Sequence, residues 1–494
     1  GGGIDSPRPA SQRAAAFILT AAMLITLAAP AFAGTWHIEN GDITVKASGT
    51  EGKNTVSQGN KKDVEDTNTI ITGTSNENTV TIDTSKGNVD VTFDDLNIDT
   101  SSRNKAAVSV TGSGNTTIKL DGDNALKSDT YRSGIASTGS LTISGGENDS
   151  LTAQGGSGAN GISSSGSLTI SGGTVTATGG NSTGIVGYGG SGIYSSSGVA
   201  ISGGAVTANG GDSKDGYGGN GIYSSSVAIS GGTVKAAGGN GKDGYGGNGI
   251  SSTSTTISGG TVTANGGSGN SSGGNGIRSN GVTISGGAVN AAGGDGGNGK
   301  DGGYGIISND IDLSGSLELT AKAGSPTGKA LLQNGRELDL NTIKDKLDPG
   351  AKVTTTDADG KVIDQVPIPR PVEPEKPVIP EESSSSSDGG SSAPSAPVSS
   401  IPGLTVTDKS GAVISYTSTQ SGNTLTVCVG RLTASFRISL AALRQLRAEG
   451  IETIAFQTIL CSTTLSVDEL LAMGGEDAEA VLTHRFTDSS LTVG

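Results

Sequence analysis

The sequence is short of the side chains on which most enzymes depend. Its 494 residues include two histidines, two cysteines, one tryptophan and 3% aromatic residues, and only 16% are charged. A polysaccharide lyase needs acidic metal ligands beside a basic residue, and a glycosidase needs two carboxylates at a defined separation. Both histidines, His37 and His484, lie outside the repeated segment at residues 134–325. The adjacent acidic pairs, Glu65-Asp66 and Asp94-Asp95, are better explained by turns or strand ends, so we expect no enzymatic activity.

Basic residues are also scarce relative to acidic ones. The chain has 32 Lys and Arg against 47 Asp and Glu, which gives a net charge of −15. Because proteins bind nucleic acid through basic side chains, this balance argues against nucleic acid as a partner. The acidic residues gather in the flanking segments, and the glycine-rich middle of the chain is almost neutral. Low charge with abundant Ser, Thr and Asn suits an extracellular surface that meets neutral, hydrated ligands.

Long apolar runs are missing except at the start of the chain. Arg8 and Arg13 precede an apolar stretch at residues 14–29, and Ala31-Phe32-Ala33 has the small-x-small form of a cleavage site. This order predicts an export signal over residues 1–33. The apolar stretch is too short for a spanning helix, so we expect no transmembrane segment in the mature chain and a secreted or cell-surface location in a bacterium. Removal of the signal takes away one acidic and two basic side chains, so the mature net charge is −16 (−15 + 1 − 2).

Glycine is abundant, with 84 residues, and much of it belongs to a repeat. Each unit contains a Gly-Ile pair, a Leu/Val-x-Ile-Ser-Gly-Gly segment, a Thr/Ala-Val-x-Ala segment and a glycine-rich loop. The isoleucines that open the units are separated by 27, 31, 29, 28, 27 and 29 residues: Ile135, Ile162, Ile193, Ile222, Ile250, Ile277 and Ile306. A period of this size indicates a solenoid. A disordered glycine-rich linker would have no reason to keep isoleucine in register.

Within each unit, aliphatic residues alternate with small polar ones, which is typical of strands with one face inward. Leu168-Thr-Ile-Ser171 and Thr174-Val-Thr-Ala177 are examples. Gly-Gly pairs are expected at the corners, where a positive φ is needed. We therefore predict an all-β fold, a parallel β-helix with three short strands per coil of about 28 residues. One coil buries too few aliphatic side chains to offset the entropy of ordering its backbone, so the coils must stack.

The repeat and its flanks divide the mature chain into five segments. Trp36, the only tryptophan, is expected to plug the open end of the stack. A run of prolines followed by serines predicts a spacer between two domains. The segments are, in order, irregular first coils with a cap, regular glycine-rich coils, a C-terminal cap, a Pro/Ser-rich linker and a small α+β domain: residues 34–133, 134–325, 326–363, 364–403 and 404–494.

The last segment has an ordinary globular composition. Alternation of apolar residues predicts strands and one helix that ends at Gly450: strands at residues 424–429, 435–440, 454–456 and 463–467 and a helix at residues 441–449. The two cysteines of the chain, Cys428 and Cys461, both lie here. They could pair after export, or both could be small buried residues of neighbouring strands.

Tyrosine forms the most suggestive pattern for binding. Tyr188, Tyr217 and Tyr245 each lie five residues before the isoleucine that opens the next coil, so they should lie one above another about 4.8 Å apart. Tyr194 and Tyr223 directly follow their isoleucines and predict a second, shorter row. Each ring offers an apolar face and a hydroxyl group, which suits glycan binding. The alternative is that stacked tyrosines only stabilise the solenoid.

A second pattern concerns calcium. Gly238-Gly-Asn-Gly-Lys-Asp243 matches the calcium-binding nonapeptide of β-roll proteins, and Gly210-Gly-Asp-Ser-Lys-Asp215 echoes it. Calcium needs six or more oxygen ligands from consecutive turns, whereas these copies are one coil apart and each carries a lysine. Asp215 and Asp243 are therefore candidate metal ligands, with ordinary Gly/Asp turns as the alternative. No cofactor is required, and calcium is the one ion that the motif would favour.

The repeated segment resembles a known family. Asn115 to Leu126, then Ser140-Leu-Thr-Ile-Ser-Gly-Gly, and then the repeated Gly-Ile and Ser-Gly-Gly-Thr-Val-Thr-Ala phrases resemble the clostridial carbohydrate-binding β-helix proteins over roughly residues 70–325. The resemblance implies a secreted, right-handed parallel β-helix, related in shape to polysaccharide lyases, that binds plant polysaccharide and can hold calcium. The glycine-rich loops are longer and poorer in acidic residues than the family's calcium sites would require, so no metal site is carried over.

These observations predict a non-catalytic extracellular protein that binds a polysaccharide or another glycan, with the tyrosine rows as the contact at a cell or host surface. Two alternatives stay open. One is a structural, adhesin-like β-helical stalk that projects another domain. The other is a polysaccharide lyase-like enzyme, which would need an Asp/Lys cluster that only the fold could assemble.

Overall fold

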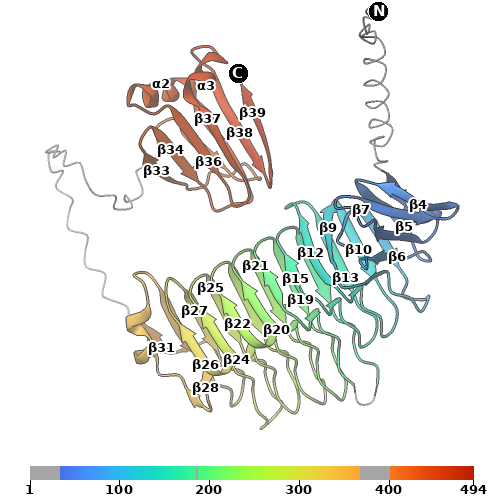
Figure 1. Ribbon diagram of the computed structural model, residues 1–494. Coiled ribbons are helices and arrows are strands. Elements are labelled where there is room, and N and C mark those ends of the chain that lie inside the picture. The colour runs from blue at the N-terminus through green and yellow to red at the C-terminus, as the bar shows by residue number, and fades with distance from the viewer. Residues whose placement is uncertain (1–33, 185–186, 368–400) are drawn as a thin grey trace, which may run out of the picture. The chain divides into compact units, whose positions relative to one another are not determined.

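The computed structural model describes residues 34–184, 187–367 and 401–494 (Figure 1). The predicted export signal and most of the predicted linker lie outside the described residues. The chain divides into two compact units between residues 369 and 370, and each unit is described by itself.

The first unit is a parallel β-solenoid, as the repeat predicts (Figure 1). Its strands form three stacks, in which each strand pairs in parallel with its equivalents in the coils before and after it. The opening isoleucines lie opposite one another from Ile135 to Ile306. The predicted repeat is therefore confirmed as one turn of the solenoid.

The stacks correspond to the three strand segments of the sequence repeat. The first stack begins each coil: β2 (Ile43–Ala47), β6 (Val80–Asp83), β8 (Val108–Thr111), β11 (Ile135–Ser137), β14 (Ile162–Ser164), β17 (Ile193–Ser195) and β28 (Leu331–Gln333). The second follows it: β1 (Thr35–His37), β5 (Thr69–Ser75), β7 (Val89–Asp99), β9 (Asn115–Asp121), β12 (Ser140–Gly145), β15 (Leu168–Ile170) and β18 (Val199–Ile201). The third precedes the loops: β10 (Asp123–Lys127), β13 (Ser150–Gln154), β16 (Thr174–Thr178), β19 (Ala205–Asn209), β21 (Thr233–Ala237), β23 (Thr261–Asn265), β25 (Ala288–Ala292), β27 (Glu318–Lys322) and β30 (Lys352–Thr356).

In the later coils the first two strands merge into one: β20 (Ile222–Ile229), β22 (Ile250–Ile257), β24 (Ile277–Ile284) and β26 (Ile306–Leu313). Five positions separate Ile222 from the next inward aliphatic, Val227, whereas six separate Ile193 from Val199. The longer step includes Gly198 at φ 146°, where the strand is interrupted. The prediction of three separate strands is therefore correct for the earlier coils only.

Each coil contributes a short set of inward aliphatic side chains to one continuous core. In the coil that opens at Ile162, this residue, Leu168, Ile170, Val175 and Ala177 are all fully buried. Burial of one such aliphatic side chain contributes about 1.5–3 kcal/mol, and each packs on its equivalents in the coils on both sides. In the five Ser-Gly-Gly corners from Gly173 to Gly287, the second glycine turns the corner at a φ of 80–85°, as at Gly173 and Gly232.

Antiparallel hairpins close both ends of the stack. At the N-terminal end, β2 pairs with β3 (Asn54–Gln58), which pairs with β4 (Lys61–Asp66), and a 3-10 turn, η1 (Ile38–Asn40), follows β1. Trp36 is only 3% exposed, and its Nε1 donates to Asp66 at 2.8 Å, which agrees with its expected role as a plug.

At the other end, β28 pairs with β29 (Arg336–Glu337), and β30 pairs with β31 (Val362–Val366). Two short 3-10 turns, η2 (Leu340–Thr342) and η3 (Lys344–Lys346), lie between the hairpins. Val366 is buried in β31. The cap boundary predicted at residue 363 therefore falls inside this strand.

The second unit is a small α+β domain, as expected. One four-stranded sheet contains β32 (Leu404–Thr407), β35 (Thr433–Ser439), β38 (Glu479–Arg485) and β39 (Asp488–Val493), and the other contains β33 (Thr417–Ser421), β34 (Thr424–Cys428), β36 (Thr453–Gln457) and β37 (Ser462–Ser466). The helices are α2 (Leu440–Ala448) and α3 (Val467–Ala472), of which the sequence predicted only the first. Among the described residues, no helix is both long enough and apolar enough to cross a membrane.

Candidate functional site

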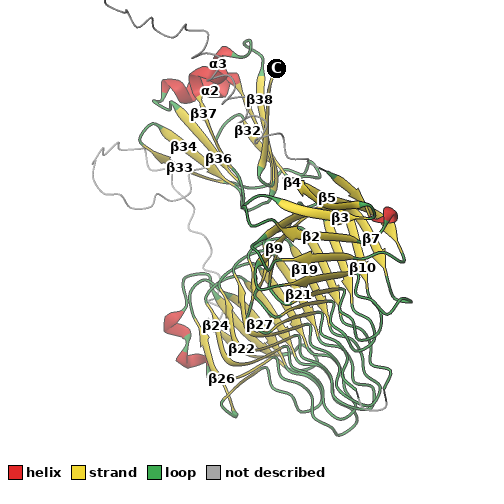
Figure 2. Cartoon of the chain, turned by 45° about the vertical axis from the view of Figure 1, so that its right-hand side comes forward, coloured by secondary structure: helices red, strands yellow, loops and turns green. Residues whose placement is uncertain are grey.

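The glycine-rich loops lie side by side along the solenoid and carry most of the candidate residues (Figure 2). Each regular loop leaves the third stack through a Gly-Gly pair and returns through a second Gly-Gly pair. In the loop after β21, for example, Gly238-Gly239-Asn240 forms the outgoing limb and Tyr245-Gly246-Gly247 forms the returning limb. The two limbs are close enough for the loop backbones to bond directly to one another.

One continuous file of backbone hydrogen bonds joins the limbs of successive loops. The amide of Gly239 donates to Gly219 at 2.8 Å, Gly247 donates to Gly239 at 2.8 Å, and Gly267 donates to Gly247 at 2.8 Å. The same pattern extends in both directions, and each glycine donates to the one before it: Gly180, Gly190, Gly211, Gly219, Gly239, Gly247, Gly267, Gly274, Gly294, Gly303, Gly324 and Gly328. We call this set the glycine file.

The glycine file requires glycine because of space. A Cβ at Gly239 would overlap the carbonyl oxygen of Gly211, and one at Gly247 would overlap that of Gly219. Neither Gly239 nor Gly247 has a positive φ. The expectation that Gly-Gly pairs turn positive-φ corners therefore holds at the Ser-Gly-Gly corners from Gly173 to Gly287. The Gly-Gly pairs of these loops serve another purpose, because the absence of a side chain permits close backbone approach.

The predicted tyrosine row forms on the returning limbs. Isolated bridges link Tyr188 to Tyr217 and Tyr217 to Tyr245. The ring centroids are 5.1 Å and 4.6 Å apart, with interplanar angles of 9° and 12°. Because Tyr217 is covered on both faces, a ligand ring can stack only on the outer face of Tyr188, which is 68% exposed, or beyond Tyr245. Between these ends the row offers ring edges and hydroxyl groups.

The second predicted row is shorter and less regular. Tyr194 and Tyr223 face outward on β17 and β20 in direct register, with ring centroids 5.5 Å apart and an interplanar angle of 39°. Ser251 and Arg278 continue this position in the next two coils, so the row ends after two rings.

A sixth tyrosine lies near the first row and was not predicted as a site residue. Tyr131 is 82% exposed and donates its amide to Ser157 at 3.0 Å. A Cβ at Gly158 would lie 3.6 Å from a ring carbon of Tyr131 and 3.8 Å from the carbonyl oxygen of Tyr188, so both tyrosines flank Gly158. Tyr131 lies four residues before Ile135, whereas the tyrosines of the first row lie five residues before their isoleucines, so the spacing did not identify it.

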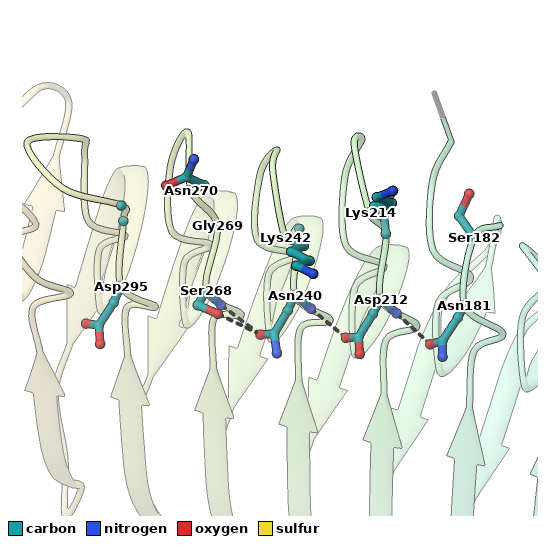
Figure 3. Close-up of a pocket in the computed structure, with 14 residues that line it drawn as sticks. Asn181, Ser182, Asp212, Lys214, Asn240, Lys242, Ser268, Gly269, Asn270 and Asp295 are labelled. Atoms are coloured by element: carbon teal, nitrogen blue, oxygen red, sulfur yellow. Dashed lines mark hydrogen bonds between the residues drawn. The ribbon is translucent and has the colours of Figure 1, made fainter. Parts of the chain in front are cut away.

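The outgoing limbs carry a row of exposed polar side chains, which we call the polar ladder: Asn181, Asp212, Asn240, Ser268 and Asp295 (Figure 3). Asp212 donates its amide to Asn181 Oδ1 at 2.8 Å, Asn240 donates to Asp212 Oδ1 at 2.8 Å, and Ser268 donates to Asn240 Oδ1 at 3.0 Å. The ladder lines a groove of about 630 Å³ that also contains Lys214 and Lys242. The sequence signal was present, because each member directly follows the Gly-Gly pair that opens its loop.

A matching set of asparagines on the returning limbs is half-buried. Asn248 donates its amide to Asn220 Oδ1 at 3.0 Å, and Asn275 donates to Asn248 Oδ1 at 2.9 Å. The side-chain amide of Asn275 also donates to Asn248 Oδ1, at 3.0 Å. These asparagines satisfy backbone groups beside the first stack, which is a structural role.

The calcium and disulfide candidates do not form groups. Asp215 and Asp243 are exposed on successive loops, and in the described part of the chain no three His, Cys, Asp or Glu side chains are grouped to hold a metal ion. Cys428 and Cys461 are free thiols, and Cys428 Sγ donates to Gln457 Oε1 at 3.3 Å.

The two acidic pairs differ in environment. Asp66 is fully buried and accepts from the amide of Gly34 at 3.1 Å as well as from Trp36, so it holds the N-terminal end together. Asp94 is half-buried and lies directly opposite Asp121 in the parallel ladder. Burial, and then the negative charges of Asp121, Asp95 and Asp149, raise the pKa of Asp94.

The chain matches no family model, and comparisons with the curated proteins and with the solved structures give no significant match. What is established is the β-solenoid fold itself.

Proposed function

We propose that this chain is a non-catalytic, exported surface protein whose solenoid binds polysaccharide along the side formed by the glycine-rich loops. The observation that carries the proposal is the exposed row of Tyr188, Tyr217 and Tyr245, in register on loops that also line a polar groove. Aromatic rings with polar tips suit ligands that have both apolar and hydroxylated faces. The likeness of the repeat phrases to the clostridial carbohydrate-binding β-helix proteins points the same way.

A pull-down of the mature chain, residues 34–494, on insoluble and soluble polysaccharides tests the proposal. We expect retention by the parent chain and loss in a Tyr188/Tyr217/Tyr245→Ala variant that still melts cooperatively. Because only the end rings have a free face, Tyr188→Ala alone should weaken binding by up to about tenfold, and Tyr217→Ala alone should weaken it less. Repeating the assay with a chelator reports on calcium.

A matched control removes exposed apolar side chains elsewhere. Val362 and Ile363 are 53% and 58% exposed on β31 of the C-terminal cap, and neither lines the groove, so Val362→Ala/Ile363→Ala should leave retention unchanged. Equal losses in this control and in the tyrosine variant would contradict a specific tyrosine contact.

A structural stalk is the second candidate, and the stacking of the tyrosines supports it. Stacked aromatic pairs contribute about 0.5–1.5 kcal/mol each beyond burial, and the glycine file ties every loop to its neighbours. If the parent chain binds no polysaccharide while the tyrosine variant melts at a lower temperature, the stalk is the better account.

A further inference from the structure

Hydrogen bonds to the backbone fix the side chains of the polar ladder. Each of Asn181, Asp212 and Asn240 uses its Oδ1 to accept the backbone amide of the next coil, at 2.8–3.0 Å. This bond holds the side chain in one orientation, and so reduces the entropy lost when a ligand binds. The side chains lie in a row and are all directed the same way (Figure 3), and all three residues line the groove.

The second polar atom of each of these side chains is not used in the ladder. The Nδ2 of Asn181, the Oδ2 of Asp212 and the Nδ2 of Asn240 have no hydrogen-bond partner among the described residues. Their order along the groove is donor, acceptor, donor, at the spacing of one coil, about 4.8 Å. All three residues are exposed, unlike the half-buried asparagines of the returning limbs.

The charges of the groove do not favour an anion. Lys214 and Lys242 line it, but so do Asp212 and Asp295, and each lysine is followed directly by an exposed aspartate. A hydroxyl group both donates and accepts hydrogen bonds, so a chain of hydroxyls matches an alternating row of fixed donors and acceptors. A phosphate or carboxylate polymer would meet the oxygens of Asp212 and Asp295 with like charge.

From this arrangement we infer that the groove along the polar ladder is a binding site for an uncharged polysaccharide. The chain of the polysaccharide runs parallel to the solenoid axis, and its hydroxyls contact Asn181, Asp212 and Asn240. The inference rests on the proposed function and deepens it, because it names the ligand class. It also assigns the specific polar contacts to the outgoing limbs of the loops rather than to the tyrosines.

Isosteric variants of the full mature chain test the inference by affinity electrophoresis in gels that contain xyloglucan, galactomannan, mixed-linkage β-glucan or polygalacturonate. Asn240→Asp keeps the Oδ1 that anchors the ladder and exchanges the outward donor for an acceptor. Asp212→Asn keeps Oδ1 and makes the reverse exchange. In both variants a ligand hydroxyl must reverse the direction of its hydrogen bond, which is unfavourable where its other contacts fix it, so each variant should bind an uncharged polymer about 2- to 10-fold more weakly.

The charge change is controlled in two ways. Asn220→Asp makes the same substitution in the half-buried set of the returning limbs, and it should not alter retardation. Asn240→Asp and Asp212→Asn change the net charge in opposite directions. A general electrostatic effect would therefore strengthen binding in one variant and weaken it in the other.

The outcomes separate this inference from the proposed function. If the parent chain is retarded by an uncharged polymer and only the tyrosine variant loses this, the function stands and the polar-ladder site is wrong. Retardation by polygalacturonate alone would overturn the assignment to uncharged polymers. Failure of the parent chain to bind any of the four polymers would overturn both.

Discussion

At the scale of single residues, some glycines of the solenoid leave no room for a side chain, and others could carry one. Gly239 lies in the glycine file, where a Cβ would overlap the Gly211 carbonyl. Gly281 lies in β24, where a Cβ would have no other atom within 4 Å, and its φ is not positive. Its register partners in the neighbouring coils are Ser254 and Asp310, which carry side chains at the same position. The same residue type thus has opposite tolerance to substitution at two places in one solenoid.

We expect Gly239→Ala to lower the free energy of unfolding by about 3 kcal/mol or more, because the methyl group forces backbone limbs apart. Gly281→Ala should be neutral or raise it by about 0.5 kcal/mol, because alanine restricts the unfolded chain. Thermal melts followed by circular dichroism compare the two variants. Equal melting temperatures for both would contradict the close-packed arrangement of the loops.

Asp94 gives a pH-dependent prediction at the same scale. Its pKa is raised in the folded chain by burial and by the facing aspartates, so its ionised form is less favourable there than in the unfolded chain. This penalty is fully present above the folded pKa and disappears as the pH falls below the unfolded value of about 3.9.

Asp94→Asn should therefore raise the melting temperature at pH 7, and the gain should shrink as the pH approaches about 4. Asp90→Asn, an exposed position on the same strand, is the control and should show no such trend. A gain that is independent of pH would mean that the carboxylate charge is not the cause.

At the scale of elements, the second unit contains a buried histidine between its two sheets. His484 on β38 is fully buried, and its ring nitrogens lie 3.1 Å from Thr458 Oγ1 and 2.7 Å from Thr463 Oγ1. The ring also packs edge-on against Phe436, with centroids 5.5 Å apart. Burial lowers the pKa of His484 from its usual 6.5, so the folded unit holds this ring neutral.

Because the folded pKa is depressed, the unfolded unit takes up a proton more readily. Stability is therefore fully present above about pH 6.5 and is lost as the pH falls from there toward the folded pKa. Scanning calorimetry between pH 7.5 and about 5 should show the melting temperature of this unit falling, and His484→Gln should flatten the trend. His37→Gln, at an exposed histidine, is the control and should leave the pH dependence unchanged. If the melting temperature of the His484 variant still falls with pH as in the parent chain, other groups cause the fall.

At the scale of the whole molecule, the solenoid was predictable because its core repeats. The inward isoleucine that opens each coil, from Ile135 to Ile306, fixes the period and the register at once, since a shift by one residue would turn every side chain to the other face. The merging of the first two strands at Ile222 depended on a single deleted position and was not foreseen.

The loops were less predictable, because their structure depends on contacts between coils. Spacing placed Tyr188, Tyr217 and Tyr245 in one row and offered ring stacking as the structural alternative, but the near-parallel planes that leave only the end faces free came from the structure. The polar ladder was missed although Asn181, Asp212 and Asn240 all follow Gly-Gly pairs, because polar residues after glycine are also typical of ordinary turns.

The glycine file affects how readily proteases can cleave the glycine-rich loops. A protease must draw several residues of an exposed segment into its active site, and loops rich in glycine are usually easy to draw out. Here, lifting one loop breaks hydrogen bonds to the loops on both sides, so cleavage needs several coils to open together. The side of the solenoid that is richest in glycine should therefore be among its most resistant to digestion.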